Sequence, residues 1–429
     1  MIKKIKANGI DEYKFLKELE ARNVETDKKI TDIVSDIINN VRKNGDEAVK
    51  EYTLKFDGKL PEYFEVPREV INDALTEADE ELVSALLNAI ENISDFHNRQ
   101  KTESFIAPKD NGVILGQRIR GLAKVGLYVP GGTAAYPSSV LMNAIPAKIA
   151  GVEEIIMITP PLKDGTPNKD ILVAAALCGV DRVFLAGGAQ AIAALAYGTD
   201  TIPKVDKIVG PGNIFVATAK KLLYGTVDID MIAGPSEILV LADSTADPKF
   251  VAADLMSQAE HDKLASAILV TTDESLVEKT EAEIKRQMEY LSRKEIIEKS
   301  LTDFGAAIIC EDKEKAVEIA NAIAPEHLEV LFENPLEYIG KLDNAGSVFL
   351  GQYASEPLGD YYAGPNHVLP TSGTARFFSP LGVQSFTKRS SFIYYTREAL
   401  EEAKDDIVLI AEREGLTAHA NAIKVRFED

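Results

Sequence analysis

Cysteine is scarce in this chain: among 429 residues there are only two, Cys178 and Cys310. They lie far apart and neither belongs to a C-x-x-C pair, which argues against a disulfide framework and against a thiolate zinc site. Long apolar runs are also missing, since no segment approaches the roughly 20 apolar residues that span a bilayer. The basic start M-I-K-K-I-K lacks the apolar stretch of a signal peptide. We therefore expect a soluble cytoplasmic protein.

Positive charge is in deficit. The chain has 47 Lys and Arg residues against 68 Asp and Glu residues, a formal net charge of −21. A protein this acidic repels phosphate backbones and anionic lipids, so neither nucleic acid nor a membrane surface is an expected partner. The acidic residues are spread along the chain, which is typical of solvated helix faces. The length and the 45% hydrophobic content predict a globular protein of about two to four domains.

Apolar spacing divides the chain into a helical beginning and a long alternating part. Apolar residues recur every three or four positions in 27–43 and 80–100, which predicts helices there. From Lys124 onward short apolar runs alternate with helical segments, which indicates parallel sheets covered on both faces. The expected strands are 124–130, 155–160, 182–186, 237–243, 266–273, 306–310, 327–332 and 346–350.

This alternation predicts an α/β protein with two parallel-sheet domains, a helical N-terminal region and a small helical C-terminal tail. The expected ranges are 1–123 for the helical region that joins the first α/β domain, 124–236 for an inserted domain, 237–380 for the rest of the first domain and 381–429 for the tail. In the tail, we expect Thr396 to cap a helix over 397–414, Gly415 to end it and Thr417 to open a second helix.

Dinucleotide fingerprints are absent: no G-x-G-x-x-G follows a strand and no G-x-x-x-x-G-K-[ST] occurs. Three glycine-rich strand ends remain, Y-V-P-G-G-T from Tyr128, A-G-G-A-Q-A from Ala186 and V-G-P-G-N-I from Val209. Each could bring backbone amides to a pyrophosphate at a helix N-terminus, and each is equally what a tight turn between strand and helix shows. These residues alone favour neither interpretation.

Histidine is rare, with five in the chain, and one of them lies in the segment S-Q-A-E-H-D. Asp247 as N-cap and Pro248 at the first helical position start the helix that ends there. Gln258 and His261 are three residues apart, so both side chains can reach one point beyond the last turn. His is the commonest metal ligand and Gln a poor one, while a histidine that only meets the negative end of a helix is more frequent.

Two further polar clusters carry candidate histidines. A-P-E-H-L-E places Glu326 and His327 before a strand, where they could transfer protons, although a solvated turn is the commoner setting for such a pair. The loop 351–376 is rich in glycine, proline and tyrosine, and it puts Asp360 seven residues before His367. Its length and aromatic content favour a functional loop over a disordered one.

The tail holds the last cluster, with Glu414 and His419 on either side of the junction between the two expected helices. Chain ends are normally dispensable, so a tail with this pair either exposes two polar residues or docks into a site of its own or of a partner subunit. His97, on the expected helix 80–100, has no proposed role.

Six sequence blocks resemble the histidinol dehydrogenase family: V-G-L-Y-V-P-G-G, G-P-G-N-I-F-V-A-T-A-K, I-A-G-P-S-E, S-Q-A-E-H-D, A-P-E-H-L-E and G-D-Y-Y-A-G-P-N-H-V-L-P-T. With the tail they run, in the family's order, from about Val125 to His419. The resemblance implies an enzyme that oxidises L-histidinol through L-histidinal to L-histidine with two NAD⁺. It also implies incomplete Rossmann-like domains and a homodimer with one Zn²⁺ per subunit and a shared active site.

The resemblance implies a role for each residue of these clusters. Glu326 would activate water, and His327 would be the base of alcohol oxidation. The implied zinc ligands are Gln258, His261, Asp360 and the partner subunit's His419. The implied substrate contacts are Ser236, Gln258, His261, His327, Asp360, His367, Glu414 and His419. The implied NAD contacts are Tyr128, Gln190 and Asn213.

Two other classes of protein share part of this pattern. A zinc hydrolase or deaminase also uses such ligands with a Glu-activated water, but it needs no second sheet domain. A two-domain solute-binding protein also places α/β lobes around a cleft, but the missing signal peptide and the Glu-His pair beside metal-type ligands count against it. Reduction of NAD by histidinol separates the dehydrogenase from both classes.

Overall fold

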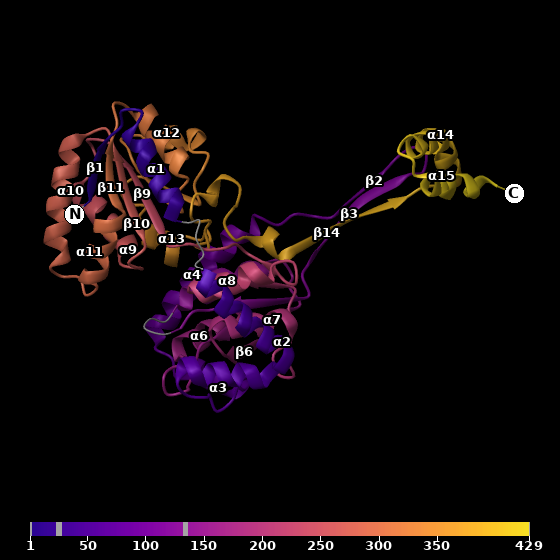
Figure 1. Ribbon diagram of the computed structural model, residues 1–429, viewed down its shortest axis with the longest axis horizontal. Helices are drawn as coiled ribbons and strands as arrows, with labels where there is room; N and C mark the ends of the chain where they lie inside the picture. Colours follow the sequence, from indigo (N-terminus) through magenta and orange to yellow (C-terminus); the bar gives the residue numbers. More distant parts are fainter. Residues whose placement is uncertain (1, 23–27, 132–135, 429) are drawn as a thin grey trace.

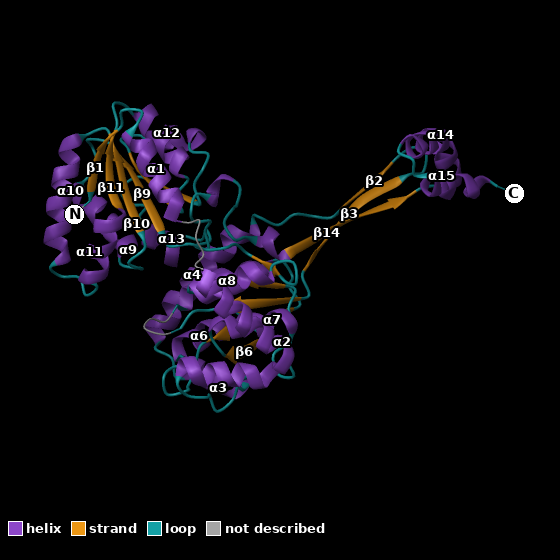
Figure 2. Cartoon of the chain, in the orientation of Figure 1, coloured by secondary structure: helices purple, strands orange, loops and turns teal. Residues whose placement is uncertain are grey.

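The computed structural model describes residues 2–22, 28–131 and 136–428. Two α/β lobes lie against each other, and an arm that ends in two helices projects away from them (Figure 1, Figure 2). Within these ranges, none of the helices combines the length and the apolar character needed to cross a membrane.

One lobe is built on a six-stranded sheet whose strands all pair in parallel, in the order β1-β11-β10-β9-β12-β13. The strands are β1 (Lys3–Lys6), β9 (Glu237–Ala242), β10 (Ser266–Thr271), β11 (Gly305–Ile309), β12 (His327–Leu331) and β13 (Ser347–Leu350). One face is covered by α9 (Pro248–Ala259), α10 (Glu274–Met288) and α11 (Lys294–Phe304), the other by α1 (Asp11–Arg22) and α12 (Lys313–Ile323). The central strands β9 and β10 are accordingly buried along their whole length.

The second lobe has a five-stranded parallel sheet in the order β6-β5-β4-β7-β8. The strands are β4 (Lys124–Tyr128), β5 (Glu154–Thr159), β6 (Arg182–Leu185), β7 (Lys207–Val209) and β8 (Asp228–Ile229). One face carries α3 (Arg68–Thr76), α4 (Glu80–Asn98), α5 (Pro137–Ile149) and α6 (Lys169–Leu177), the other α2 (Lys28–Asp57), α7 (Gly188–Tyr197) and α8 (Ile214–Leu223). Two parallel sheets covered on both faces confirm the predicted α/β class.

The beginning of the chain differs from the predicted helical region that joins the first α/β domain. It starts with β1, which adds an edge strand to the six-stranded sheet, and α1 packs on that sheet. Helices α2, α3 and α4 instead cover the five-stranded sheet. β1 is not evident from the sequence because K-K-I-K has a single buried apolar residue, Ile5, and its pairing partner β11 lies far along the chain.

The arm is a second departure from the prediction. Strands β2 (Phe105–Pro108), β3 (Ile114–Gly121) and β14 (Thr387–Tyr394) form an antiparallel sheet in the order β14-β3-β2. The predicted tail helices are confirmed as α14 (Arg397–Arg413) and α15 (Thr417–Lys424), and they sit at the far end of the arm (Figure 1). The tail is therefore not purely helical. β14 shows no period-two apolar pattern because almost all its residues are exposed on both faces.

Candidate active site

The Glu326–His327 pair lies at the amino end of β12, beside the amino end of the neighbouring strand β9. Both side chains are held by the backbone of one residue, Glu237. The Glu326 Oε2 atom accepts a hydrogen bond from the Glu237 N–H at 2.9 Å, and the His327 Nδ1 atom lies 3.0 Å from the Glu237 carbonyl oxygen. Ser236 directly precedes this residue, so it lies at the same edge of the sheet.

This arrangement fixes the orientation of the His327 ring. Because the Glu237 carbonyl can only accept, His327 donates from Nδ1, which leaves the Nε2 lone pair free in the neutral ring. The Nε2 atom is buried, has no hydrogen-bond partner in the described part of the chain, and lies 3.8 Å from Asp360 Oδ1. Burial lowers the pKa of His327, but the charges of Glu326 and Asp360 outweigh it and bring that pKa to about 10.

Glu326 titrates near neutrality. Burial raises its pKa to about 7, although the nearby His327 charge and the hydrogen bond from the Glu237 N–H act in the opposite direction. A carboxyl with such a pKa exchanges protons readily at physiological pH, as a general base requires.

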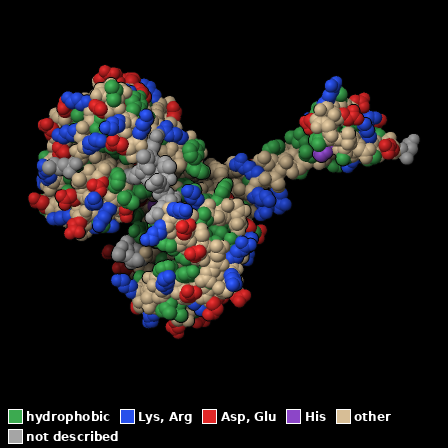
Figure 3. Space-filling view, in the orientation of Figure 1, with side chains coloured by type: hydrophobic (Ala, Val, Ile, Leu, Met, Phe, Trp, Pro, Cys, Tyr) green, Lys and Arg blue, Asp and Glu red, His purple; other side chains and the backbone are tan. Residues whose placement is uncertain are grey.

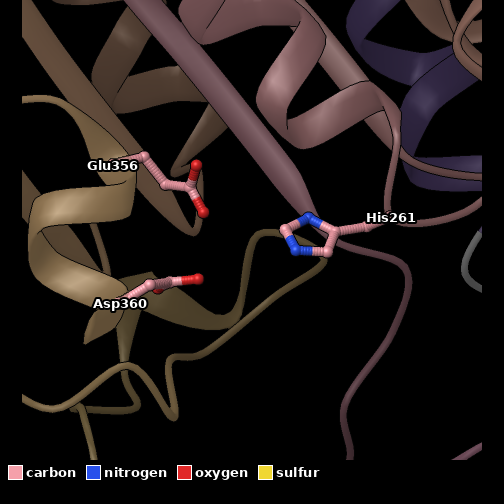
Figure 4. Close-up of side chains that lie close together, drawn as sticks. All are labelled: His261, Glu356 and Asp360. Atoms are coloured by element: carbon pink, nitrogen blue, oxygen red, sulfur yellow. The ribbon is translucent and has the colours of Figure 1, made fainter. Parts of the chain in front are cut away.

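The short helix α13 (Glu356–Tyr361) brings carboxylates to the same place. Glu356 and Asp360 are four residues apart and share one face of this helix. Potential ligand atoms of His261, Glu356 and Asp360 all lie within 4.8 Å of one another, and Figure 4 shows the three side chains pointing toward a common centre. The cluster therefore brings the end of α9 together with α13, a helix that lies almost a hundred residues later in the chain.

Gln258 completes the case for a cation at this point. Its side chain is fully buried, yet neither its amide oxygen nor its amide nitrogen has a hydrogen-bond partner among the described residues. Such an amide is costly unless a further group binds it. One imidazole, carboxylate oxygens and an amide oxygen suit a divalent ion such as zinc, so these residues fit the metal that the sequence comparison implies.

Glu356 is a residue that the sequence analysis missed. Its carboxylate accepts a hydrogen bond from the Ser257 hydroxyl at 2.8 Å, and its N–H donates to Glu329 Oε1 at 2.7 Å. Burial and the charge of Asp360 raise the pKa of Glu356 to about 8. The segment S-E-P-L-G-D contained a signal for it, because Ser and Pro mark a helix start and the two carboxylates have helical spacing.

His367 joins the same cluster. Its Nδ1 atom lies 3.1 Å from the Asp360 carbonyl oxygen and 4.0 Å from Asp360 Oδ1. A cavity of about 290 Å³ opens beside it, lined by His327, Asp360, Leu358 and Phe349 among others. This space has the size and mixed lining of a small-molecule site.

Glu414 and His419 lie elsewhere. Glu414 caps α14 and His419 lies on α15, both are exposed, and both helices lie at the end of the arm, far from the cluster around Asp360 (Figure 1). Within one chain, therefore, the predicted zinc ligands His261 and Asp360 lie together, Gln258 lies three residues before His261, and His419 lies apart from them.

The predicted NAD contacts gather at the carboxyl edge of the five-stranded sheet. The Tyr128 hydroxyl accepts a hydrogen bond from the Gly188 N–H at 3.2 Å, and burial raises the pKa of Tyr128 to about 12. Gln190 is buried with no partner for Oε1 among the described residues. Asn213 caps α8 by accepting hydrogen bonds from the N–H groups of Phe215 and Val216.

Close backbone packing explains one glycine of this edge. Gly210 has a φ of +110°, and a Cβ there would lie 2.1 Å from the Tyr128 carbonyl oxygen. This edge is where open α/β sheets bind nucleotides, and Gln190 offers a free acceptor there, so the residues fit a dinucleotide. The glycines of Y-V-P-G-G-T reach into 132–135, outside the described residues.

The two edges are connected directly. β8 ends at Ile229, and residues 230–236 lead from the carboxyl edge of the five-stranded sheet to Glu237 at the amino edge of the six-stranded sheet. The Gly234 N–H of this connection donates to Thr371 Oγ1 at 2.6 Å, which ties it to the loop that follows Asp360 and His367. A short link of this kind keeps both groups of residues within reach of one bound pair of small molecules.

The fold and the site together define an α/β enzyme with a proton-transfer pair, a cation-type cluster and a dinucleotide-type sheet edge, the features of a metal-assisted dehydrogenase. The chain belongs to the histidinol dehydrogenase family, whose sequence model matches residues 20–427. This confirms the resemblance seen in the six sequence blocks.

Individual relatives agree over the full length. A histidinol dehydrogenase from Clostridium acetobutylicum is 58% identical over 428 residues, covering 100% of this chain and 99% of the relative. One from Listeria innocua is 58% identical and covers 96% of this chain and 97% of the relative. The crystal structure of histidinol dehydrogenase from Elizabethkingia anophelis superposes with a TM-score of 0.93 at 39% identity, covering 99% of this chain and 98% of that one.

Proposed function

We propose that this chain oxidises L-histidinol through L-histidinal to L-histidine with two NAD⁺ and one zinc ion per subunit. The observation that carries the proposal is the convergence of His261, Glu356 and Asp360 beside the Glu326–His327 pair, with the buried, unpartnered Gln258 amide three residues before His261. Metal-type ligands and a proton-transfer pair side by side suit the oxidation of an alcohol and then of an aldehyde.

Gln258, His261 and Asp360 would hold the metal, with Glu356 behind them. A bound divalent ion would supply positive charge that orients the substrate's amine and imidazole beside the carbinol carbon. Asp360 belongs to the cluster and its Oδ1 lies 3.8 Å from His327 Nε2, so a substrate anchored at the cluster presents its hydroxyl to that nitrogen. His367, which lines the same cavity beside Asp360, would also contact the substrate.

His327 serves as the base of the first oxidation. A cation bound at Asp360 would offset the negative charge that brings the His327 pKa to about 10, and would leave the ring neutral. Its Nδ1–H is committed to the Glu237 carbonyl, so Nε2 of the neutral ring accepts the hydroxyl proton as hydride leaves the carbinol carbon. NAD⁺, held along the edge marked by Tyr128, Gln190 and Asn213, supplies the hydride acceptor. A low-dielectric pocket around a buried ring excludes water from this step.

Glu326 serves the second oxidation. With a pKa of about 7, its carboxylate takes a proton from a water molecule that adds to the aldehyde carbon. As water adds, His327 returns the proton it took in the first oxidation to the aldehyde oxygen, which forms the hydrate. The hydrate then loses hydride from the same carbon to the second NAD⁺ and its hydroxyl proton to His327. Both residues are held by the Glu237 backbone, so the aldehyde need not leave the cavity between the steps.

A second copy of the chain would complete the site. The arm is exposed on both faces: Ile106 is 68% exposed, Ile393 72% and Ile410 61%, and Figure 3 shows hydrophobic side chains along it. Apolar surface of this kind marks an interface. In a homodimer with exchanged arms, Glu414 and His419 of one chain would enter the active site of the other. A cytoplasmic location belongs to the same proposal, supported by two free cysteines.

The test is the yield of NADH per histidinol consumed, measured with and without a chelator. Two NADH per histidinol, loss of activity on chelation and recovery with zinc are the expected results. One NADH per histidinol, or activity that a chelator leaves intact, would contradict the proposal.

A further inference from the structure

The loop that carries Asp360 and His367 is anchored in the other lobe. The Asn92 side chain, on α4, donates from Nδ2 to the Tyr362 carbonyl oxygen at 3.0 Å. Gly364 has a φ of +116°, and a Cβ there would lie 2.8 Å from the Asn92 carbonyl oxygen, so the two backbones are in close contact. Val368 is buried in the same core as α4 and α5.

Asn366 is the polar centre of this anchor, and it is only 4% exposed. Its Nδ2 donates to the Met142 carbonyl oxygen at 2.6 Å and lies 3.2 Å from His97 Nε2. Its Oδ1 accepts a hydrogen bond from the Val368 N–H at 2.9 Å. Every polar atom of the amide is therefore used, and the neighbouring residue is His367, which in turn contacts the Asp360 carbonyl.

His97 contacts Asn366 although 269 residues separate the two in the sequence. It lies in the last turn of α4, is fully buried, and its Nε2 must accept because the Asn366 amide can only donate there. The His97 Nδ1 atom has no partner in the described ranges, so the contact with Asn366 is the hydrogen bond that orients the ring. Burial lowers the pKa of His97 to about 4, which keeps the ring neutral and Nε2 an acceptor at physiological pH.

We propose that His97 is a positioning residue that, through Asn366, fixes Asp360 and His367 relative to the NAD-side lobe. The role of Asp360 and His367 rests on the proposed function. The contact between His97 and Asn366 adds an explanation of how these two residues are held in position. Metal-cluster and substrate residues come from one lobe and the dinucleotide edge from the other, so a contact that crosses between them controls the distance over which hydride moves.

The experiment compares His97→Leu, which removes the acceptor at similar volume, with His97→Gln, whose Oε1 can replace it. Outer-shell partners of metal ligands typically affect metal affinity by about 10- to 100-fold. We expect His97→Leu to raise the KM for histidinol about tenfold and to lose zinc to a competing chelator about tenfold more readily, with the KM for NAD unchanged. His97→Gln should restore both values.

Ile93→Ala is the matched control, because Ile93 is fully buried on the same helix and its side chain has no hydrogen-bonding group to offer Asn366. It should lower Tm without changing zinc retention or either KM. If His97→Leu lowers only Tm, or if His97→Gln fails to restore zinc retention, His97 is merely structural. If His97→Leu does not fold, Asn366→Ala carries the same test from the other partner. Wild-type enzyme that makes no NADH from histidinol overturns the proposed function instead.

Discussion

The two parallel sheets use opposite edges. In the five-stranded sheet Tyr128, Gln190 and Asn213 follow the strand ends, at the carboxyl edge where such sheets usually bind ligands. In the six-stranded sheet Glu326 and His327 stand at the amino edge. The difference follows from the connection 230–236, which runs from one carboxyl edge directly to the other sheet's amino edge. The rule that open α/β sheets bind ligands at their carboxyl edge anticipates the position of the first group but not that of the second.

The edges also differ in how their polar groups are satisfied. At the carboxyl edge of the five-stranded sheet Tyr128 and Asn213 accept hydrogen bonds from backbone N–H groups, and among the three predicted NAD contacts Gln190 Oε1 is the one buried side-chain atom that lacks a partner in the described residues. At the amino edge of the six-stranded sheet, Gln258 and His327 Nε2 lack partners among the described residues, and burial raises the pKa of Glu326 and Glu356. Buried groups of this kind destabilise a fold, so they are kept for binding and catalysis. Substitutions at this edge should therefore affect chemistry more than stability.

The largest expected effect is that of Glu326→Gln. The amide cannot accept a proton from water, so histidinal oxidation should fall by about 10²- to 10⁴-fold, whereas oxidation of histidinol to histidinal should fall less than about tenfold. Single-turnover NADH formation from each substrate measures the two steps separately. Equal losses in both steps would show that Glu326 does not have the separate role proposed here.

The second largest expected effect is the recovery of activity when two inactive variants are mixed, which the proposed exchange of arms predicts. His261→Asn and His419→Asn chains should each be nearly inactive alone. In a mixed dimer one site carries both changes and the other carries none, so random mixing after unfolding and refolding should restore about one quarter of wild-type activity. Each variant refolded alone is the control. No recovery on mixing would mean that the arm serves its own chain's site or none.

The pH dependence of the aldehyde step should reveal Glu326. Only its carboxylate is a base, and the carboxylate fraction falls as pH drops through the pKa of about 7. The rate from histidinal should therefore decline about tenfold per pH unit below that point and level off above it. Stopped-flow NADH formation from pH 5 to 9 gives the profile, and Glu326→Gln provides the control because its residual rate should lose this limb. A wild-type profile that is flat across pH 7 would rule out the assignment.

Local sequence patterns predicted the sheets and the start of α9 well, because strand burial and helix capping depend on neighbouring residues. The Asp247 side chain does accept from the Lys249 N–H, as its place before Pro248 indicated. Contacts between distant segments were not predictable from such patterns. β1, at the start of the chain, pairs with β11, which lies about 300 residues later. Glu356 approaches His261 only because α13 packs beside α9. His419 lies on α15, far from the other candidate ligands of its own chain (Figure 1), and its proposed place in a partner's site is not something a local pattern can reveal.

The smallest expected effect belongs to the carboxyl edge. Asn213→Ala removes the cap of α8, which should cost about 1 kcal/mol of stability, and it should raise the KM for NAD several-fold with the KM for histidinol unchanged. Asn168→Ala is the control, since Asn168 caps α6 with the same pair of hydrogen bonds, to the N–H groups of Asp170 and Ile171. Thermal unfolding and steady-state kinetics compare the two. An identical KM for NAD in both variants would make Asn213 a cap only, and would leave the dinucleotide edge to Tyr128 and Gln190.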